Sequence, residues 1–295
     1  MPLLWTPLTD RAGRFAPLKC AALAATLAPA LWIAISAVEG RLGSRPVMEA
    51  IHQTGLWAVR MLALTLAVTP LRLATRWPKL VSIRRILGVS VLAYAILHVG
   101  LFAYDQHFAA LHIASEIVKR LYLTIGFVAL VLLCLLGATS TDRMIARLGS
   151  RQWTRLHRVI YAIAALASVH FFMQSKLDIT QPTIMAGIFA LLFCYRLFAA
   201  RSGGDLSALS VAALALGAAT ATALGEALWF AVSAGAPLAL VLAANFDFSY
   251  MARPAWYVLA AGLVLFAARL SRPVFAPRSA AAVRRRALGD AKASG

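Results

Sequence analysis

Charged residues are scarce in this sequence. They make up 14% of its 295 residues, whereas soluble domains carry about 25%. Hydrophobic residues account for 61% of the chain, and the mean hydropathy is +0.78. Because the apolar residues are concentrated in long uncharged runs, the composition predicts a polytopic membrane protein. It excludes a soluble enzyme, a secreted domain and a disordered chain.

Cysteine is also rare, and its placement excludes several kinds of site. Cys20, Cys134 and Cys194 lie in or beside different apolar runs and form neither a CxxC nor a CxxCH motif. A disulfide framework, a cysteine-based zinc site and covalently attached c-type haem therefore have no support. The sequence also lacks a GxGxxG motif, which disfavours a nicotinamide-binding domain in these residues.

Eight apolar runs predict eight transmembrane helices, because about 20 residues are needed to cross the hydrocarbon. The runs do not alternate with a period of two, which excludes membrane strands. The stretch Ala227–Phe246 contains Gly235 and Pro237, and it is either a ninth span or the end of the seventh helix followed by an interfacial segment. The eight runs are Ala21–Val38, Thr54–Leu71 (which contains Arg60), Ile86–Tyr104, Leu121–Thr141, Val159–Ser175, Ile179–Tyr195, Leu206–Gly225 and Pro254–Ala268.

Basic residues outnumber acidic residues by 29 to 11, giving a net charge of +18. Lys and Arg accumulate in cytoplasmic loops of membrane proteins. With eight spans and a cytoplasmic N-terminus, 22 of the 29 lie inside, six lie outside and Arg60 lies within the second span. Both termini are therefore expected in the cytoplasm, and a ninth span is disfavoured because it would place Arg284–Arg286 outside. The basic face is expected to meet anionic lipid headgroups rather than nucleic acid.

Three histidines within the runs are the first candidates for function, because ionisable groups inside a bilayer are costly. His98 lies on the third helix, and His157 and His170 lie on the fifth. His98 is about 21 Å beyond Arg84, and His170 is about 20 Å beyond His157, so His98 and His170 fall at one depth in the outer leaflet. Imidazoles on two facing helices predict a bis-histidine site for b-type haem. Hydrogen bonding between helices is the alternative interpretation.

The inner ends of the third and fifth helices carry His157, Arg84 and Gly88. Thirteen residues fall about 140° short of whole turns, so either the fifth helix is distorted or His157 and His170 address different partners. Arg84 lies at the depth of His157 and shares a face with His98. Gly88, one turn further on, either lets a flat macrocycle approach the backbone or allows tight helix packing.

Other ionisable residues are weaker candidates. Arg60 either pairs with a haem propionate or extends to the interface. Glu226 is expected at the outer interface beside Trp229 rather than buried. A zinc or other non-haem metal site is disfavoured, because no Asp, Glu or Cys lies near the depths of the histidines.

A series of motifs between Thr54 and Lys176 resembles the MsrQ family, also called YedZ. This family comprises haem-binding membrane subunits of bacterial periplasmic methionine-sulfoxide reductase systems, within the ferric-reductase-like transmembrane proteins. Thr54-Gly55, Trp57-Ala58 and Thr69-Pro70-Leu71 fit the resemblance too. The ordered motifs that carry it are Arg84-Arg85-x-Leu87-Gly88, Tyr94, His98, Lys119-Arg120-x-Tyr122-x-Thr124-x-Gly126, Thr139-Ser140-Thr141, Leu148-Gly149-x-x-x-Trp153-x-x-Leu156-His157-x-x-x-Tyr161 and His170.

The resemblance implies an all-α, six-helix core over residues 1–200 that binds one or two b-type haems through the iron ligands His98, His157 and His170. Relatives carry a second histidine on the third helix where this chain has Arg84, so Arg84 as an inner-haem ligand is a hypothesis. Arg60 remains a candidate for a propionate. FMN is a cofactor implied by the resemblance alone, since no glycine-rich loop for its phosphate is found.

The resemblance also implies partners and a location. Electrons from the quinone pool or a cytosolic flavin reductase would pass to a periplasmic, molybdopterin-containing MsrP-like subunit, which repairs oxidised envelope proteins. The chain would lie in the bacterial inner membrane, with no substrate chemistry of its own. Residues 201–295 are expected to form an extension with about two further spans and a basic cytoplasmic tail. The alternatives are a b-type ferric reductase and a transporter; a transporter predicts internal repeats, which are not found.

Overall fold

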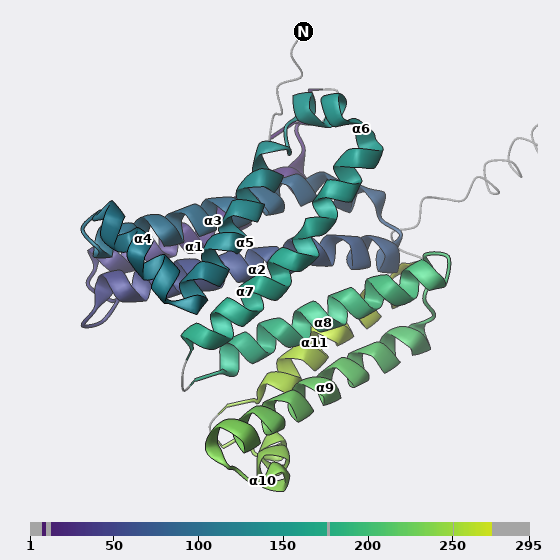
Figure 1. Cartoon of the computed structure of the whole chain (residues 1–295). Coiled ribbons are helices and arrows are strands. Elements are labelled where there is room, and N and C mark those ends of the chain that lie inside the picture. Colours follow the sequence, from purple (N-terminus) through teal and green to yellow (C-terminus); the bar gives the residue numbers. More distant parts are fainter. Residues whose placement is uncertain (1–7, 10–12, 176–177, 250, 273–295) are drawn as a thin grey trace, which may run out of the picture.

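Helices form the whole regular structure of the residues that the computed structural model describes, which are 8–9, 13–175, 178–249 and 251–272 (Figure 1). Three short 3-10 helices accompany the α-helices: η1 (Pro78–Ile83), η2 (His157–Val159) and η3 (Ala244–Phe246). The α-helices are α1 (Pro17–Val38), α2 (Pro46–Thr75), α3 (Arg84–Asp105), α4 (Ala110–Lys119), α5 (Leu121–Ala138), α6 (Asp142–Leu156), α7 (Ile160–Gln174), α8 (Thr180–Arg201), α9 (Ala208–Ala234), α10 (Leu238–Ala243) and α11 (Pro254–Leu270).

Seven helical segments in the described residues are long and apolar enough to cross a membrane. They contain α1, α2, α3, α5, α6 with α7, α8 and α9. The eighth expected span corresponds to α11, whose 17 residues lie at the lower limit of about 17 for a transmembrane helix. The prediction of an all-α, multi-pass membrane bundle is confirmed.

The stretch Ala227–Phe246 contains the end of one long helix followed by a short segment, as in the second of its two predicted forms, and it is not a ninth span. Helix α9 continues to Ala234 and ends at Gly235, whose φ of 65° lies in the left-handed region that favours glycine. Pro237 then precedes α10, which has six residues. A helix of that length is about 9 Å long and cannot cross the hydrocarbon.

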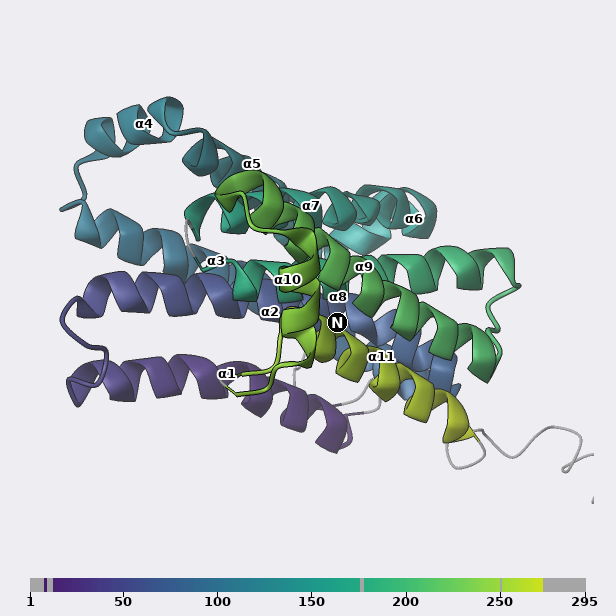
Figure 2. The same cartoon turned by 90° about the horizontal axis from the view of Figure 1, so that it is seen from below.

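Two pairs of helices form the part of the bundle that holds the candidate site. Helix α2 packs along α3, and α5 packs along α7, whereas contacts between the two pairs are much sparser than those within them. Helix α1 runs beside α2 and α3 (Figures 1 and 2). Helices α8, α9 and α11 pack together on the other side of α2. The boundary between these two pairs, across which contacts are sparse, is called the seam below.

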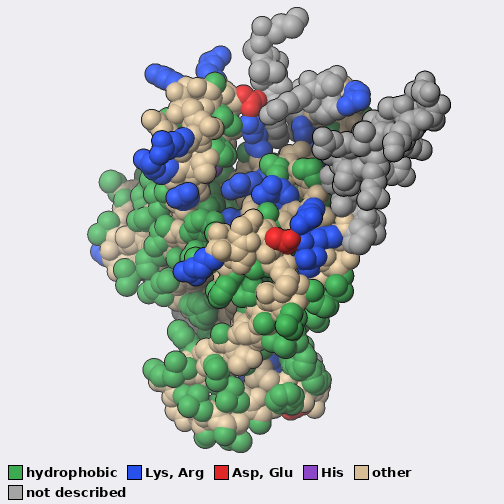
Figure 3. Space-filling model, turned by 90° about the vertical axis from the view of Figure 1, so that its right-hand side faces the viewer, with side chains coloured by type: hydrophobic (Ala, Val, Ile, Leu, Met, Phe, Trp, Pro, Cys, Tyr) green, Lys and Arg blue, Asp and Glu red, His purple; other side chains and the backbone are tan. Residues whose placement is uncertain are grey.

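Lys and Arg gather at the end of the bundle where α2 ends and α3 begins, hereafter the basic end (Figure 3). Asp205, in the turn between α8 and α9, lies among three of these arginines. Its carboxylate is 2.5 Å from Arg272, 2.9 Å from Arg76 and 3.8 Å from Arg269. Arg272 also donates hydrogen bonds to the carbonyls of Leu73 and Ala74 at the end of α2. Arg272 is thereby fixed to the last turn of α2.

An Asp205→Asn variant tests this cluster. The hydrogen bond from Arg272 holds the pKa of the Asp205 carboxyl below its ordinary value. The stabilisation is therefore fully present above the unfolded-state pKa of about 3.9 and is lost as the pH falls through the lower folded-state value. Because Asp205 is partly exposed, we expect a modest effect: in detergent the Asp205→Asn protein should melt about 2 °C below the unchanged protein near neutral pH. The difference between the two melting temperatures should shrink in acid. Glu39→Gln, which breaks one exposed pair with Arg41, is the control, and an equal effect of the two changes contradicts the prediction.

The expectation that Glu226 is an exposed interfacial residue is wrong. Its side chain is 2% exposed, and its Oε1 lies 3.8 Å from Nε of Arg253, at the start of α11. The depth was estimated from position along the helix, which correctly places Glu226 towards the outer end of α9. Position along one helix does not reveal that α11 covers that face.

Candidate functional site

The structure brings His98 of α3 and His170 of α7 together. Their ring centroids are 6.4 Å apart, and the ring planes are nearly perpendicular, at 85°. Nδ1 of His98 is 2.8 Å from the carbonyl oxygen of Ile51, and Nδ1 of His170 is 2.7 Å from that of Tyr122. Because a carbonyl can only accept, each Nδ1 carries the proton, and each Nε2 keeps a lone pair for a ligand bond.

A glycine on the neighbouring helix makes room for each imidazole. A Cβ on Gly126 of α5 would lie 2.8 Å from Nδ1 of His170, and a Cβ on Gly55 of α2 would lie 3.0 Å from Nδ1 of His98. Each glycine follows, by four residues, the carbonyl that accepts the histidine proton. The two helix pairs therefore use one local design, which we call the glycine seat: Ile51 with Gly55, and Tyr122 with Gly126.

The spacing of the two rings fits axial ligation of a haem iron. With the two Nε2 atoms pointing at one another, a metal atom about 2.0 Å from each nitrogen, and each ring centre about 1.2 Å behind its nitrogen, would separate the centroids by about 6.4 Å. The observed separation is 6.4 Å. One histidine lies on each side of the boundary between the α2–α3 pair and the α5–α7 pair, across which helix contacts are sparse.

The histidine pair lies towards the end of the bundle opposite the basic end. His98 is seven residues before Asp105, the last residue of α3, which corresponds to about 10 Å along the helix axis. Helix α4 packs on α5 at this end, where Thr124 of α5 donates a hydrogen bond of 2.5 Å to the carbonyl of Ile117 in α4. A group held between the histidines is thus close to one surface of the membrane and far from the other.

Known proteins resemble this chain over the same helices. Residues 54–168 match the family described as "Ferric reductase like transmembrane component". The "Protein-methionine-sulfoxide reductase heme-binding subunit MsrQ" of Xanthomonas campestris pv. campestris (strain B100) is 43% identical over 187 residues, covering 61% of this chain and 85% of that protein. The chain belongs to the MsrQ family. Proteins of the same name from Herminiimonas arsenicoxydans and Rhodospirillum rubrum are 39% and 38% identical, covering 59% and 64% of this chain and 81% and 88% of their own lengths. No solved structure matches the chain.

His157 has different surroundings in this member of the MsrQ family. It lies in η2, the 3-10 turn that joins α6 to α7, and its ring stacks on Trp153 at a centroid distance of 3.8 Å. Its Nδ1 is 3.1 Å from the carbonyl oxygen of Trp153, and its Nε2 is 3.3 Å from Oγ of Ser140. Both alternatives from the sequence therefore apply: the helix is distorted at this point, and His157 and His170 have different partners.

Arg84 is the first residue of α3, at the basic end. It directly follows η1 and therefore lies at the same end of the bundle as η2, which contains His157. Arg196 donates a hydrogen bond of 2.7 Å to the hydroxyl of Tyr161, one turn beyond His157. The inner region of this MsrQ chain is therefore a cationic cluster with one imidazole, unlike the outer pair of imidazoles.

Two other candidates have definite neighbours. The guanidinium of Arg60 is 3.3 Å from Oε1 of Gln181 at the start of α8 and lies 4.8 Å above the ring of Trp57. These contacts direct Arg60 towards α8, while its predicted role as a propionate partner stays a prediction. A Cβ on Gly88 would meet the side chain of Thr65 at 3.9 Å, an ordinary contact. Close helix packing therefore does not require glycine at that position.

Within the part of the chain that the structure describes, no three His, Cys, Asp or Glu residues converge on a metal site. The helical rise predicts the depths of His98 and His170 from the sequence. The glycine seats depend on contacts between two helices, which the sequence does not show. Their signal is present in the MsrQ motifs, where a threonine precedes each glycine closely: Thr54 directly before Gly55, and Thr124 two residues before Gly126.

Proposed function

We propose that this chain is a haem b electron-transfer subunit of a methionine-sulfoxide reductase system, with His98 and His170 as the axial ligands. The observation that carries the proposal is the imidazole pair, whose centroids lie 6.4 Å apart with both Nδ1 atoms bonded to backbone carbonyls. The names of the similar MsrQ proteins, which describe heme-binding subunits, support the same assignment.

Bound haem supplies one-electron chemistry at its iron, and the chain's own residues prepare the site. The Nδ1–H group of His98 donates a hydrogen bond to the carbonyl of Ile51, and that of His170 donates to the carbonyl of Tyr122. These bonds fix the tautomer and the orientation of each ring and increase the basicity of its Nε2. The glycine seats hold the imidazoles against α2 and α5, so that each Nε2 is free of competing protein contacts. The apolar helices around the seam keep water away from the iron.

The charge distribution supports a direction for the electrons. We propose that the basic end faces the cytoplasm of a bacterium and that the chain lies in its inner membrane. The histidine pair would then lie near the periplasmic surface, close to an acceptor outside. The proposed acceptor is a periplasmic, molybdopterin-containing MsrP-like subunit. The proposed donors are the quinone pool and a cytosolic flavin reductase, and FMN remains a cofactor suggested by the family resemblance.

We also propose that residues 1–200 form the haem-binding core and residues 201–295 an extension. The matching MsrQ proteins cover 59–64% of this chain, so more than a third of it lies outside each match. The bonds from Arg272 to the end of α2 support an extension that is fastened to the core rather than flexibly linked to it.

The hypothesis of a second haem, held at the basic end by His157 and Arg84, has its own test. We expect Arg84→Ala to remove one of two haems from the purified protein, as measured by extraction and counting. Arg85→Ala is the matched control, because the neighbouring Arg85 pairs with Asp142 instead. Full haem content and an unchanged spectrum in Arg84→Ala would show that Arg84 is not a ligand.

The proposed function is tested by a reduced-minus-oxidised visible spectrum of the detergent-purified chain, produced with haem available. A six-coordinate b-type spectrum with one or two haems per chain is expected. Folded protein that contains no haem would refute the electron-transfer function and leave the histidines as packing residues.

A further inference from the structure

A stripe of arginines follows helix α6 at the basic end. Thr141 caps the first turn by accepting a hydrogen bond from the backbone N–H of Met144. At Gly149 the backbone has φ 75° and ψ 153°, which divides α6 into two arms. Arg143 and Arg147 lie on the first arm, four residues apart, and Arg151 and Arg155 lie on the second with the same spacing. A spacing of four residues places side chains on one face of a helical arm.

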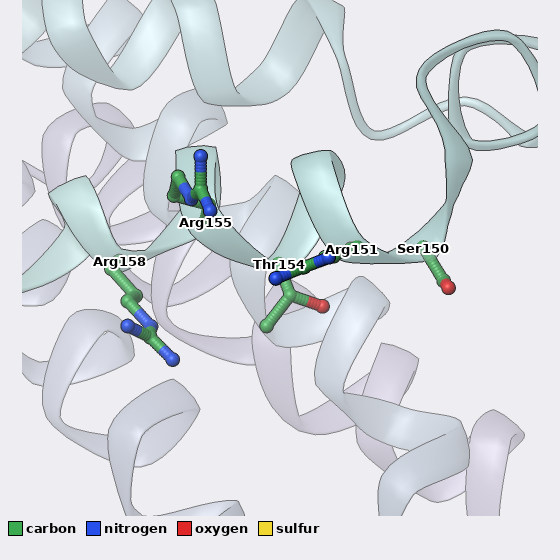
Figure 4. A pocket seen from close by; sticks show the side chains of 5 residues that line it. All are labelled: Ser150, Arg151, Thr154, Arg155 and Arg158. Carbon is green, nitrogen blue, oxygen red and sulfur yellow. The ribbon is translucent and has the colours of Figure 1, made fainter.

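The second arm and the turn after it border a hollow of about 410 Å³. In Figure 4, Ser150, Thr154 and Arg158 project to the same side of this segment, and the guanidinium of Arg151 lies beside Thr154. Arg155 completes the lining. The hollow thus combines three guanidinium groups with two hydroxyls and contains no carboxylate in its lining.

These arginines have no anionic partner in the described part of the chain. None of the five from Arg143 to Arg158 forms an ion pair with a described carboxylate. The two acidic residues described at this end are engaged elsewhere: Asp142 with Arg85, and Asp205 with the arginines around α11. The charge in the hollow is therefore available to a ligand.

The hollow faces away from the helical bundle. All five lining residues are exposed, whereas the half-buried Trp153 and His157 of the same segment contact the end of α5: Trp153 donates to the carbonyl of Thr139, and His157 contacts Ser140. The hollow is consequently on the outside of the protein, where α7 emerges at the basic end. This level corresponds to the headgroups of the adjoining leaflet and to the solution beyond them.

We propose that the hollow formed by Ser150, Arg151, Thr154, Arg155 and Arg158 binds a phosphate group. Guanidinium groups donate paired hydrogen bonds to phosphate oxygens, and hydroxyls supply further donors. The phosphate belongs either to an anionic phospholipid of the adjoining leaflet or to a soluble molecule. This site is separate from the histidine pair and does not depend on haem.

Binding is measured by titrating the purified full-length chain with two pairs of probes. Dioctanoyl phosphatidylglycerol is compared with dioctanoyl phosphatidylcholine, which has the same tails and no net charge. FMN is compared with riboflavin, which lacks the phosphate. Preference for phosphatidylglycerol identifies a lipid source, and preference for FMN identifies a soluble source.

Two double variants separate a built site from general positive charge. Arg151→Gln/Arg155→Gln removes two charges inside the hollow, and Arg143→Gln/Arg147→Gln removes two charges with the same spacing outside it. We expect the preferred probe to bind at least tenfold more weakly to the first variant and less than twofold more weakly to the second. An equal loss in both variants, or no preference within either probe pair, overturns the proposal. The melting temperature and haem spectrum of each variant report folding and the histidine site independently.

Discussion

His170→Ala is expected to abolish the six-coordinate b-type spectrum and to lower the haem content at least tenfold, which corresponds to about 1.4 kcal/mol or more of lost binding free energy. The physical reason is that α7 offers the imidazole of His170 opposite that of His98, with centroids 6.4 Å apart. Without it, one face of the iron has no protein nitrogen. His98→Ala should have the same effect, and the measurement is the reduced-minus-oxidised spectrum together with extracted haem.

A matched control and a rescue distinguish loss of a ligand from loss of the fold. His112 is an exposed histidine of α4, so His112→Ala should retain the full spectrum. Free imidazole added to His170→Ala should restore a six-coordinate spectrum, because it fills the space that the side chain leaves. Full haem content in both His98→Ala and His170→Ala contradicts the assignment of the ligands.

Gly126→Ala is expected to lower haem affinity by about 10–100-fold although it changes no ligand. The added Cβ would lie 2.8 Å from Nδ1 and 2.9 Å from Cε1 of His170, so the ring must move away from α5. That movement lengthens the 2.7 Å hydrogen bond to Tyr122 and turns Nε2 away from His98. Haem titration of the purified variant and its reduction potential are the measurements.

The two glycine seats predict a graded result. At Gly55 the added Cβ would lie 3.0 Å from the ring of His98, so Gly55→Ala should weaken haem binding less than Gly126→Ala does. Gly100 lies two residues beyond His98 on α3, and a Cβ there would meet nothing within 4 Å. Gly100→Ala should leave haem binding unchanged, since alanine is also the better helix former. A loss in Gly100→Ala equal to that in Gly126→Ala would show that helix packing, rather than the seat, is responsible.

The membrane-spanning helices and the histidine pair could be predicted because each rests on a signal within one segment. Uncharged runs of about 20 residues mark spans, and the helical rise converts the positions of His98 and His170 into depths. The all-α bundle was confirmed in this way. The proximity of the two rings followed from equal depth once their helices lie on either side of one seam.

Features that depend on contacts between segments could not be predicted. The burial of Glu226 depends on α11 covering its helix, and the fastening of Arg272 depends on α2 ending beside it. Helices α4 and α6 lie between the predicted spans, because they are too short or too polar to cross a membrane. The seats at Gly55 and Gly126 have meaning only when the neighbouring helix supplies a histidine at the same level.

The sparse contact between the α2–α3 and α5–α7 pairs has a consequence for how the cell produces this protein. The α2–α3 pair and the α5–α7 pair can each form as they leave the translocon, since contacts within each pair outnumber those between the two pairs. If haem binds between the histidines as proposed, it links the two pairs, and its binding energy adds to the stability of the assembled form. Chains made during a shortage of haem would lack this link between the two pairs and would be less stable. The abundance of the protein would then follow the haem supply, with no separate regulator required.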